Sequence, residues 1–375
     1  MFYNVIIVGG GLAGLTSAVH LSKKGLSVLL IEKNTYPKHK VCGEYVSNEV
    51  LPYLKALGFD PFDFGAKNIT DFTFSTPKNQ VITAKLPTGG FSISRYCMDW
   101  ELSKKARAHG TEIRHESVTD ITFNTNAFTV STAKGTTYTA EFVIGSFGKR
   151  SNLDVKMNRP FIQKNAPFLG VKAHYKGTFA DHAVGLHNFK GGYCGISKVE
   201  TDLVNVCYIT NYKAFKKYKD IAAFEQHVLH QNTFLKKMFT EFNIAFEKPL
   251  TIAQVSFATK QPVENHILMC GDSSGMIHPL AGNGMSMAIR AAQMVSLLLL
   301  KYNSGELQSR EELEQKYTKA WNNEFQSRLK AGHLIAKLFR LGWFSELIML
   351  FLKTIPCVLP YIIKKTHGKP MKALL

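Results

Sequence analysis

Cysteine is scarce in this chain, and its six copies among 375 residues are scattered. No two of them form a CxxC pair and none lies near histidines at zinc-site spacing, so neither a metal centre nor a disulfide framework is expected. Free thiols are typical of a reducing, intracellular compartment. The six are Cys42, Cys97, Cys194, Cys207, Cys270 and Cys357.

Acidic residues are also few, with 28 Asp and Glu against 46 Lys and Arg, which gives a net charge of +18. The lysines are spread along the chain and are not clustered with stacking aromatic residues in a recognition motif, so nucleic acid is not an expected partner. A basic surface fits an acidic cofactor or an anionic membrane face better.

Low-complexity tracts are absent, and 45% of the residues are hydrophobic, which is enough to bury the cores of two intertwined domains. The apolar N-terminus lacks the basic segment of a signal peptide. Its glycines also belong to a motif that a mature protein would have to keep, so cleavage is not expected.

A clean transmembrane helix is missing as well, because charges and prolines interrupt the most apolar stretch, residues 338–365. This stretch either lies on a membrane, with lysines at the head groups, or packs against the rest of the protein. Both arrangements favour a lipophilic small-molecule substrate. We expect a cytoplasmic protein with peripheral contact at the inner face of the membrane. The interrupting residues are Arg340, Glu346, Lys353, Pro356 and Pro360.

The first informative motif follows a short β-branched run, NVIIV at 4–8, that predicts a buried parallel strand. Gly9, Gly11 and Gly14 form a GxGxxG turn that leads into a helical pattern. The first glycine permits the tight turn, the second lets the backbone approach a pyrophosphate, and the third lets the helix pack on the strand. The next strand ends at Glu32, which is placed to accept hydrogen bonds from a ribose. Together these parts predict a dinucleotide site.

A second motif lies about 260 residues later, where ILMC at 267–270 predicts another buried strand. The sequence GDSSGMIHPLAGNG follows, and then a helix begins near residue 285. Asp272 can bind a ribityl hydroxyl group. Pro279 and the Gly282–Gly284 turn allow the backbone to lie close to a planar ring and aim the helix N-terminus at it, where negative charge is stabilised.

These two motifs resemble the FAD signatures of flavoproteins with the p-hydroxybenzoate hydroxylase fold, which include aromatic monooxygenases, flavin halogenases and geranylgeranyl reductases. The resemblance runs from residue 1 to about residue 300 and implies FAD as cofactor. The residues expected to contact FAD are Gly9, Gly11, Leu12, Ala13, Gly14, Glu32, Lys33, Arg95, Val118, Asp272, Pro279, Gly282, Asn283 and Gly284.

Two intermediate motifs extend the resemblance. Arg95, in SISRYCMDWELSKKARAHG, is similar to the family's arginine that precedes a helix and reaches the flavin side. VIGSFGKRS, at 143–151, occupies the place of a family motif that ends in Asp-Gly and touches both FAD and the nicotinamide cofactor. Phe147 replaces that aspartate, which puts direct recognition of NAD(P)H by this loop in doubt, although Lys149 and Arg150 can still attract phosphates.

The expected fold is therefore α/β, with a Rossmann-type FAD-binding domain, an inserted antiparallel-sheet substrate domain and a helical C-terminal segment. Strand patterns in the middle of the chain fall at 71–75, 168–175, 183–189, 193–199 and 203–210. The predicted boundaries are 1–65, 92–152 and 265–300 for the FAD-binding domain, 66–91 and 153–264 for the substrate domain, and 301–375 for the C-terminal segment.

The segment KHKVCGEYVSNEV, at 38–50, raises the question of which side chain faces the flavin. Its Cys42 and Gly43 match the first two positions of a Cys-Gly-Gly motif in the geranylgeranyl reductases, whereas Glu44 is closer to the Gly-Glu-Ser of the halogenases. The candidate catalytic residues are Cys42, Glu44 and His278, and none stands in a motif that fixes its role.

Three functions follow as alternatives. The first is an FAD-dependent monooxygenase that uses NAD(P)H as a transient reductant and hydroxylates a hydrophobic aromatic or polyene substrate. The second is a geranylgeranyl-reductase-like flavoenzyme that saturates isoprenoid double bonds, and the third is a non-catalytic flavin-binding or electron-transfer protein. The stretch GGYCGISKV lacks the tryptophans found in this region of the reductases and halogenases, which weakens a close assignment to either.

Overall fold

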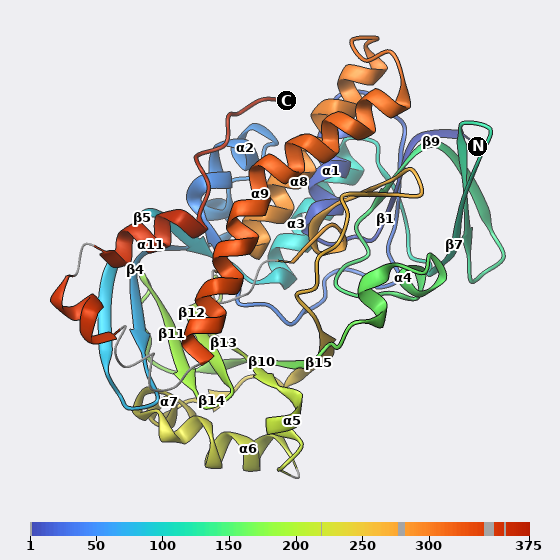
Figure 1. Ribbon diagram of the computed structural model, residues 1–375. Coiled ribbons are helices and arrows are strands. Elements are labelled where there is room, and N and C mark those ends of the chain that lie inside the picture. The colour runs from blue at the N-terminus through green and yellow to red at the C-terminus, as the bar shows by residue number, and fades with distance from the viewer. Residues whose placement is uncertain (1, 219, 277–281, 341–348, 356–357) are drawn as a thin grey trace.

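The computed structural model describes residues 2–218, 220–276, 282–340, 349–355 and 358–375. In these ranges the chain forms two β-sheets, one on the right of Figure 1 and one at its lower left, with long helices beside them. The N-terminus lies at the far end of the first sheet, away from the C-terminal helices (Figure 1).

The first sheet is a twisted, mainly parallel sheet whose central strands are apolar on both faces. Its order is β16-β17-β9-β1-β2-β6, and β7 and β8 extend it from β9 as an antiparallel hairpin. The run NVIIV is buried in β1, as its β-branched residues predict. The strands are β1 (Phe2–Val8), β2 (Val28–Ile31), β6 (Glu112–Arg114), β7 (Val118–Asn124), β8 (Ala127–Thr132), β9 (Thr137–Gly145), β16 (Val263–Glu264) and β17 (Ile267–Met269).

Helices cover one face of this sheet and share a single hydrophobic core with it. Leu15, Leu102, Ile289 and Tyr317, one from each of four helices, are buried together in that core. The opposite face packs against β7, β8 and α4. The four helices are α1 (Leu12–Lys23), α3 (Arg95–Ala108), α8 (Gly284–Asn303) and α9 (Arg310–Arg340); the short ones are α2 (Leu51–Ala56) and α4 (Asn152–Lys156).

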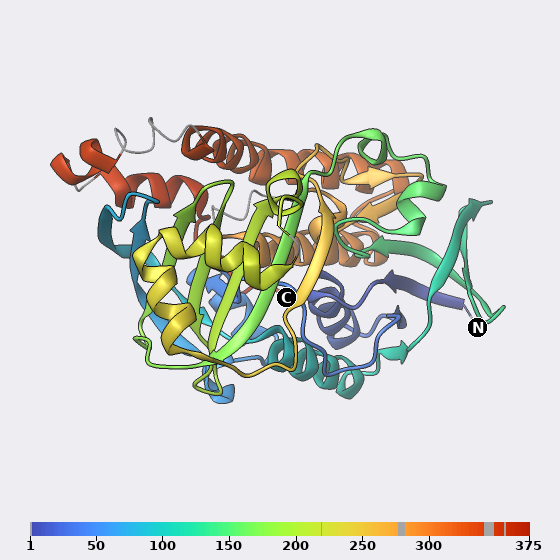
Figure 2. The same cartoon turned by 90° about the horizontal axis from the view of Figure 1, so that it is seen from below.

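The second sheet is mainly antiparallel, in the order β14-β10-β13-β12-β11-β4-β5-β3, with β15 paired to β10. Side chains alternate between its faces, so Cys194 and Ile196 pack against a layer of short helices while Tyr193 points to the other side. Figure 2 shows that layer in yellow across the sheet. The elements are β3 (Tyr45–Ser47), β4 (Lys67–Ser75), β5 (Val81–Ser92), β10 (Phe168–Lys176), β11 (Ala183–Phe189), β12 (Gly192–Lys198), β13 (Val204–Asn211), β14 (Asn243–Ile244), β15 (Leu250–Val255), α5 (Tyr212–Phe215), α6 (Ile221–His227) and α7 (Thr233–Glu241).

The C-terminal segment is helical and returns to the edge of the second sheet. A helical stretch at 349–354 and α11 (Val358–Thr366) follow α9 and pack on β4 and β5, where Phe74 and Ile82 contact Met349 and Leu359. None of the helices in the described ranges is long and apolar enough to cross a membrane.

The expected fold class is confirmed, including the second sheet and the helical C-terminal segment. The domain boundaries stay a prediction. One detail bears on them, because β3 falls within the range assigned to the first domain but pairs with β5 in the second sheet. The segment between Glu32 and α2 therefore links the two sheets, and it contains the candidates Cys42 and Glu44.

Candidate functional site

The three glycines of the first motif, Gly9, Gly11 and Gly14, have different structural roles. Side chains at Gly9 and Gly14 would collide with backbone, because a β-carbon at Gly14 would lie 2.1 Å from the carbonyl oxygen of Gly9, and one at Gly9 would lie 2.3 Å from that of Ser146. A β-carbon at Gly11 would meet only the Arg95 guanidinium, at 3.8 Å. The space beside Gly11 is open, and no described side chain caps the N-terminus of α1 there. Both features suit a pyrophosphate.

Glu32 lies at the end of β2 and is held in place by its neighbours. Its carboxylate accepts hydrogen bonds from the backbone N–H of Gly10, at 2.7 Å, and from the backbone N–H and the side-chain amide of Asn34, at 2.9 and 2.8 Å. A carboxylate offers about four lone-pair sites, so about one remains for a ribose hydroxyl. Lys33 is exposed beside it.

Arg95 begins α3 next to the glycine turn. Its Nε and Nη2 atoms donate to the two carboxylate oxygens of Asp99, each at 2.8 Å, and Lys40 lies 2.9 Å from the same carboxylate. Asp99 is fully buried. This bidentate pair fixes the guanidinium beside Gly11, where it can face an anionic group.

The second motif forms the opposite wall of the site. Asp272 lies in a short 3₁₀ turn, Gly271–Ser273, and Asn283 stands at the N-terminus of α8. Lys260 joins this wall to the loop after β9, because its ammonium group donates to the carbonyl oxygens of Asp272, at 2.6 Å, and Lys149, at 2.7 Å. Burial lowers the pKa of Lys260 to about 8. Lys260 therefore fixes the distance between the two loops.

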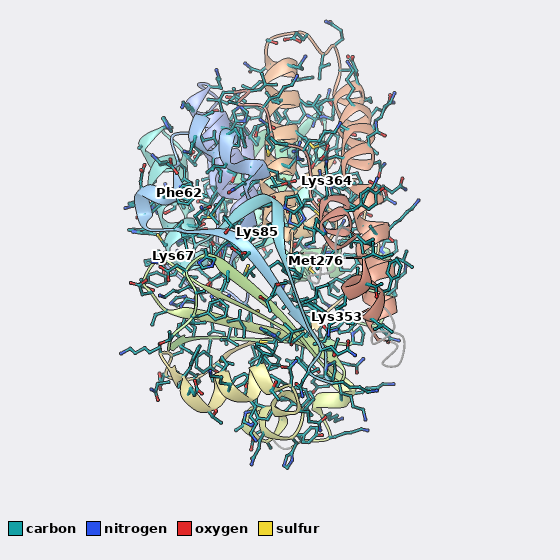
Figure 3. The ribbon with its side chains drawn as sticks, turned by 90° about the vertical axis from the view of Figure 1, so that its left-hand side faces the viewer. Phe62, Lys67, Lys85, Met276, Lys353 and Lys364 are labelled. Atoms are coloured by element: carbon teal, nitrogen blue, oxygen red, sulfur yellow. The ribbon has the colours of Figure 1, made fainter. Side chains whose placement is uncertain are left out.

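A single cavity of about 1040 Å³ runs from the glycine turn to the C-terminal helices. Most ligand pockets span roughly 300–1,000 Å³, so there is room for a cofactor and a substrate together. One end is lined by both glycine motifs, and the other by apolar residues of β4, β5, β12, β13, β15 and α11. Met276 lies between β5 and the C-terminal helices in Figure 3 and borders this apolar end.

Glu44 is the centre of a buried polar cluster on the cavity wall. It is completely buried and has a φ of 56°, in the left-handed region that few residues other than glycine adopt. One carboxylate oxygen accepts from the ammonium of Lys172 and from the backbone N–H of Arg95, and the other from Nε2 of His174 at 2.8 Å. Burial alone would raise the pKa of Glu44, but Lys172 and His174 lower it to about 2. Glu44 is therefore ionised, and both of its carboxylate oxygens are engaged by protein groups.

His39 stands beside this cluster and is stacked on Tyr96. Burial and the nearby Lys172 lower the pKa of His39 to about 4, so its ring is neutral near pH 7. His39, Glu44 and His174 offer ligand atoms within 4.8 Å of one another, as a metal ion would require. The Lys172 ammonium already neutralises Glu44 and would repel a cation there. The absence of a metal site stays a prediction.

Cys42 carries a free thiol on the cavity wall and is partly exposed. The side-chain amide of Asn205 donates to the carbonyl oxygens of Cys42, at 3.3 Å, and Gly43, at 2.9 Å, and so holds this turn against β13. Of the two candidates in the turn, Cys42 is a free, partly exposed thiol that borders the cavity, whereas the carboxylate of Glu44 is engaged with the protein.

The structure brings most of the predicted site residues together along the cavity, and their contact with FAD itself stays a prediction. Gly14 lies behind the lining, where it packs α1 against the glycine turn. Val118 is partly buried at the start of β7, against the other face of the first sheet, and is not among the cavity-lining residues. His278 and Pro279 lie outside the described residues. Those that line the cavity are Gly9, Gly11, Leu12, Ala13, Glu32, Lys33, Cys42, Glu44, Arg95, Asp272, Gly282, Asn283 and Gly284.

Several site residues were missed by sequence reasoning. Lys172 and His174 alternate on β10, where two polar residues among apolar ones are a signal for a buried polar contact. No sequence signal indicated the docking of the C-terminal tail, because backbone groups of the tail make the contacts with Glu49. The N–H groups of Gly368 and Met371 donate to the carboxylate and the carbonyl oxygen of Glu49, and His367 lines the cavity.

Comparison with known proteins identifies the family. A family model described as "FAD binding domain" matches residues 3–320. Among curated relatives, the digeranylgeranylglycerophospholipid reductase of Methanosarcina acetivorans is 25% identical over 334 residues, which cover 85% of this chain and 80% of that protein. The conditioned medium factor receptor 1 of Dictyostelium discoideum is 23% identical over 353 residues, covering 86% of this chain and 68% of that protein.

Solved structures show the same fold. A flavin-dependent brominase superposes with a TM-score of 0.80 at 19% identity and covers 98% of this chain and 93% of its own. A myxobacterial chondrochloren halogenase superposes with a TM-score of 0.76 at 18% identity, covering 89% of this chain and 82% of its own.

The chain therefore belongs to the FAD-binding domain family, and it is an FAD-dependent oxidoreductase of the superfamily of p-hydroxybenzoate hydroxylase and the geranylgeranyl reductases. The site fits FAD on its own geometry. The open space at Gly11 suits the pyrophosphate, Glu32 keeps about one lone pair for the ribose, and the N-terminus of α8 borders the cavity where the flavin ring would lie.

We predict that the substitutions Gly11→Val and Gly14→Ala separate cofactor binding from folding. A valine at position 11 would fill the space of the pyrophosphate without touching backbone, so the purified protein should keep its melting temperature without FAD but lose bound flavin absorbance. Alanine at position 14 would overlap the Gly9 carbonyl group, so it should destabilise the fold by about 2 kcal/mol or more. Normal flavin content in Gly11→Val would contradict this assignment.

We predict that Glu44→Gln leaves Lys172 buried without a counter-charge and lowers the free energy of unfolding by about 3–5 kcal/mol at pH 7. Since the folded pKa of Glu44 is about 2, below its ordinary value of 4.5, its ionic contribution is complete above pH 4.5 and is lost as the pH falls toward 2. The stability gap between wild type and variant should therefore shrink across that window in urea titrations.

Glu225→Gln is the matched control. Burial raises the pKa of Glu225 to about 7, and the hydroxyl group of Tyr208 donates to it at 3.0 Å. The folded state therefore favours the protonated form of Glu225, which glutamine imitates, so stability at pH 7 should change little. Equal losses of unfolding free energy in Glu44→Gln and Glu225→Gln would contradict the stabilising ionic role assigned to Glu44.

Proposed function

We propose that this FAD-dependent oxidoreductase reduces carbon–carbon double bonds in a long, apolar, isoprenoid-like substrate. The observation that carries the proposal is the apolar half of the cavity, which continues from the cofactor end to the C-terminal helices. It is lined by Phe72, Phe74, Ile82, Leu86, Val184, Leu186, Ile209, Ile252, Leu352, Leu359, Ile362 and Ile363. Such a surface can release water from an extended hydrocarbon chain but offers few polar groups to orient a small aromatic acid.

The comparisons support a reductase over the alternatives. Curated relatives from two Methanosarcina species, which match most of this chain, are named digeranylgeranylglycerophospholipid reductases. Monooxygenation, the first expectation from the sequence, has no comparable support among these relatives. We therefore place double-bond reduction ahead of hydroxylation.

NAD(P)H remains the proposed reductant, docking transiently. The family resemblance places Phe147 at the position of an aspartate, so a contact through that carboxylate is not available to this chain. Lys149 and Arg150 border the cavity next to Phe147 and provide positive charge for the phosphates.

The chain's own residues would orient the substrate, exclude water and supply a proton. FAD that has been reduced by NAD(P)H would supply a hydride to one carbon of the double bond, and the other carbon needs a proton. Glu44 is a poor donor because it is ionised and engaged by Lys172. We assign the proton to the sulfur of Cys42, whose thiol is free on the cavity wall between the glycine turn and the apolar half.

We predict that the holoprotein, reduced under anaerobic conditions, is reoxidised when a long-chain polyene in detergent is added, and that the product has gained hydrogen. Flavin absorbance and product mass spectrometry give the two readouts. Product that appears only with oxygen and carries an added oxygen atom would instead establish hydroxylation. Reoxidation by neither polyene nor oxygen would favour a flavin-binding protein without catalysis.

The role of Cys42 is tested in the same assay with Cys42→Ala. This variant should keep FAD but lower turnover at least about tenfold, as loss of a general acid does. Cys97→Ala is the control, because Cys97 is also a free, partly buried thiol but does not border the cavity. Equal turnover of Cys42→Ala and Cys97→Ala would contradict the role of Cys42 as the proton donor.

We also predict that Gly195→Leu shortens the substrate that can be accommodated. Gly195 lies on β12 between Cys194 and Ile196, whose side chains face the short helices, so a side chain at 195 would point into the cavity. A β-carbon there would lie 3.7 Å from the nearest atom, the carbonyl oxygen of Cys207, and would be tolerated. The KM for a long polyene should rise several-fold, while flavin content and turnover of a short polyene stay unchanged. Equal effects on the long and the short polyene would contradict a binding path for the long substrate that passes Gly195.

A further inference from the structure

The C-terminal helices carry apolar side chains on two opposite sides. On the inner side, Met349, Leu352 and Leu359 are buried against β4 and β5. On the outer side, large apolar side chains stay in contact with solvent. Their exposed fractions are 61% for Leu350, 51% for Phe351, 40% for Ile355 and 60% for Tyr361. A helix that only packs on its own protein has one apolar stripe, so the second side calls for an occupant outside the described chain.

The charge of this segment is of one sign. Residues 349–375 contain lysines at positions 353, 364, 365, 369 and 372 but no aspartate or glutamate. Lys353, Lys364 and Lys365 are exposed, and Figure 3 shows Lys353 and Lys364 on the same side of the molecule. Exposed apolar side chains flanked by lysines are complementary to a surface with hydrocarbon beneath anionic head groups.

The same helices close the apolar end of the cavity. Leu352, Leu359 and Ile363 line it, one to a few residues from the exposed Phe351, Tyr361 and Lys364. A single pair of short helices thus separates the cavity from the outer apolar surface. A surface that holds these helices would therefore lie next to the apolar end of the cavity.

We propose that residues 349–355 and 358–365 form a docking surface for an anionic lipid bilayer, with Leu350, Phe351, Ile355 and Tyr361 inserted among the acyl chains and the lysines at the head groups. Membrane docking goes beyond the proposed reaction and does not depend on it. Only the idea that a lipid substrate passes from the bilayer into the cavity rests on the proposed function. A second copy of this chain is a poorer occupant, because two such surfaces would bring like charges together.

The experiment is co-sedimentation of the FAD-loaded full chain with vesicles of phosphatidylcholine, with and without phosphatidylglycerol. Binding should require phosphatidylglycerol and weaken at high salt. Reversing three charges in Lys353→Glu, Lys364→Glu and Lys365→Glu together should weaken binding at least about tenfold. Replacing the inserted aromatic residue in Phe351→Ser should weaken it roughly fivefold or more.

Each variant has a matched control elsewhere on the chain. Lys24→Glu, Lys134→Glu and Lys156→Glu together make the same change in net charge at exposed lysines of the first-sheet half. Phe2→Ser removes a phenylalanine that is 58% exposed at the start of β1, and Figure 1 shows β1 away from the C-terminal helices. Both control proteins should sediment with anionic vesicles like the wild type.

Equal loss of binding in test and control variants would overturn the proposal in favour of general attraction by the net positive charge. No binding by the wild type would also overturn it, and a concentration-dependent dimer abolished by Phe351→Ser would replace the bilayer with a second copy. The reduction of a detergent-solubilised polyene does not require vesicles. Failure of membrane binding is therefore distinguishable from failure of the proposed reaction.

Discussion

The carboxylate of Glu44 is the contact on which the arrangement of the site depends. The residue combines a left-handed backbone conformation with a fully buried charge. The backbone conformation costs about 1–2 kcal/mol and the unpaired charge would cost several more. Both are stable here because Lys172 and His174 of β10 meet the carboxylate together with the N–H of Arg95 at the start of α3. Glu44 thereby fixes the second sheet to the nucleotide-binding half, and the cavity lies between them.

This contact also determines which side chains of the cavity wall are structural and which can take part in the reaction. An ionised carboxylate with both oxygens engaged by protein groups holds the turn at 42–44 in one conformation and is poorly suited to exchange protons. Asn205 holds the same turn from β13 through the carbonyl oxygens of Cys42 and Gly43, and Cys42 borders the cavity there. Lys260 has the corresponding role at the cofactor end, where it sets the spacing between the loops of Lys149 and Asp272. The reacting region is thus supported by buried charges that are structural.

The sequence predicts the features of this molecule that are local. Gly9, Gly11 and Gly14, the apolar strand before them and Glu32 lie within one strand-helix-strand unit, and their spacing predicts their contacts. The contact of Glu44 with Lys172 and His174 spans 128 and 130 positions, and nothing near Glu44 in the sequence indicates its partners. The docking of the C-terminal tail on Glu49 uses backbone N–H groups, which every residue except proline has, so side-chain patterns cannot indicate it.

A double-mutant cycle between Glu44→Gln and Lys172→Met measures the central contact most directly, with urea unfolding of the four FAD-loaded proteins at pH 7. Each single change leaves one buried group without its partner, whereas the double change removes both. The account predicts that the double variant recovers much of the lost stability, with a coupling free energy of about 2 kcal/mol or more. Losses that add to within about 0.5 kcal/mol would contradict it.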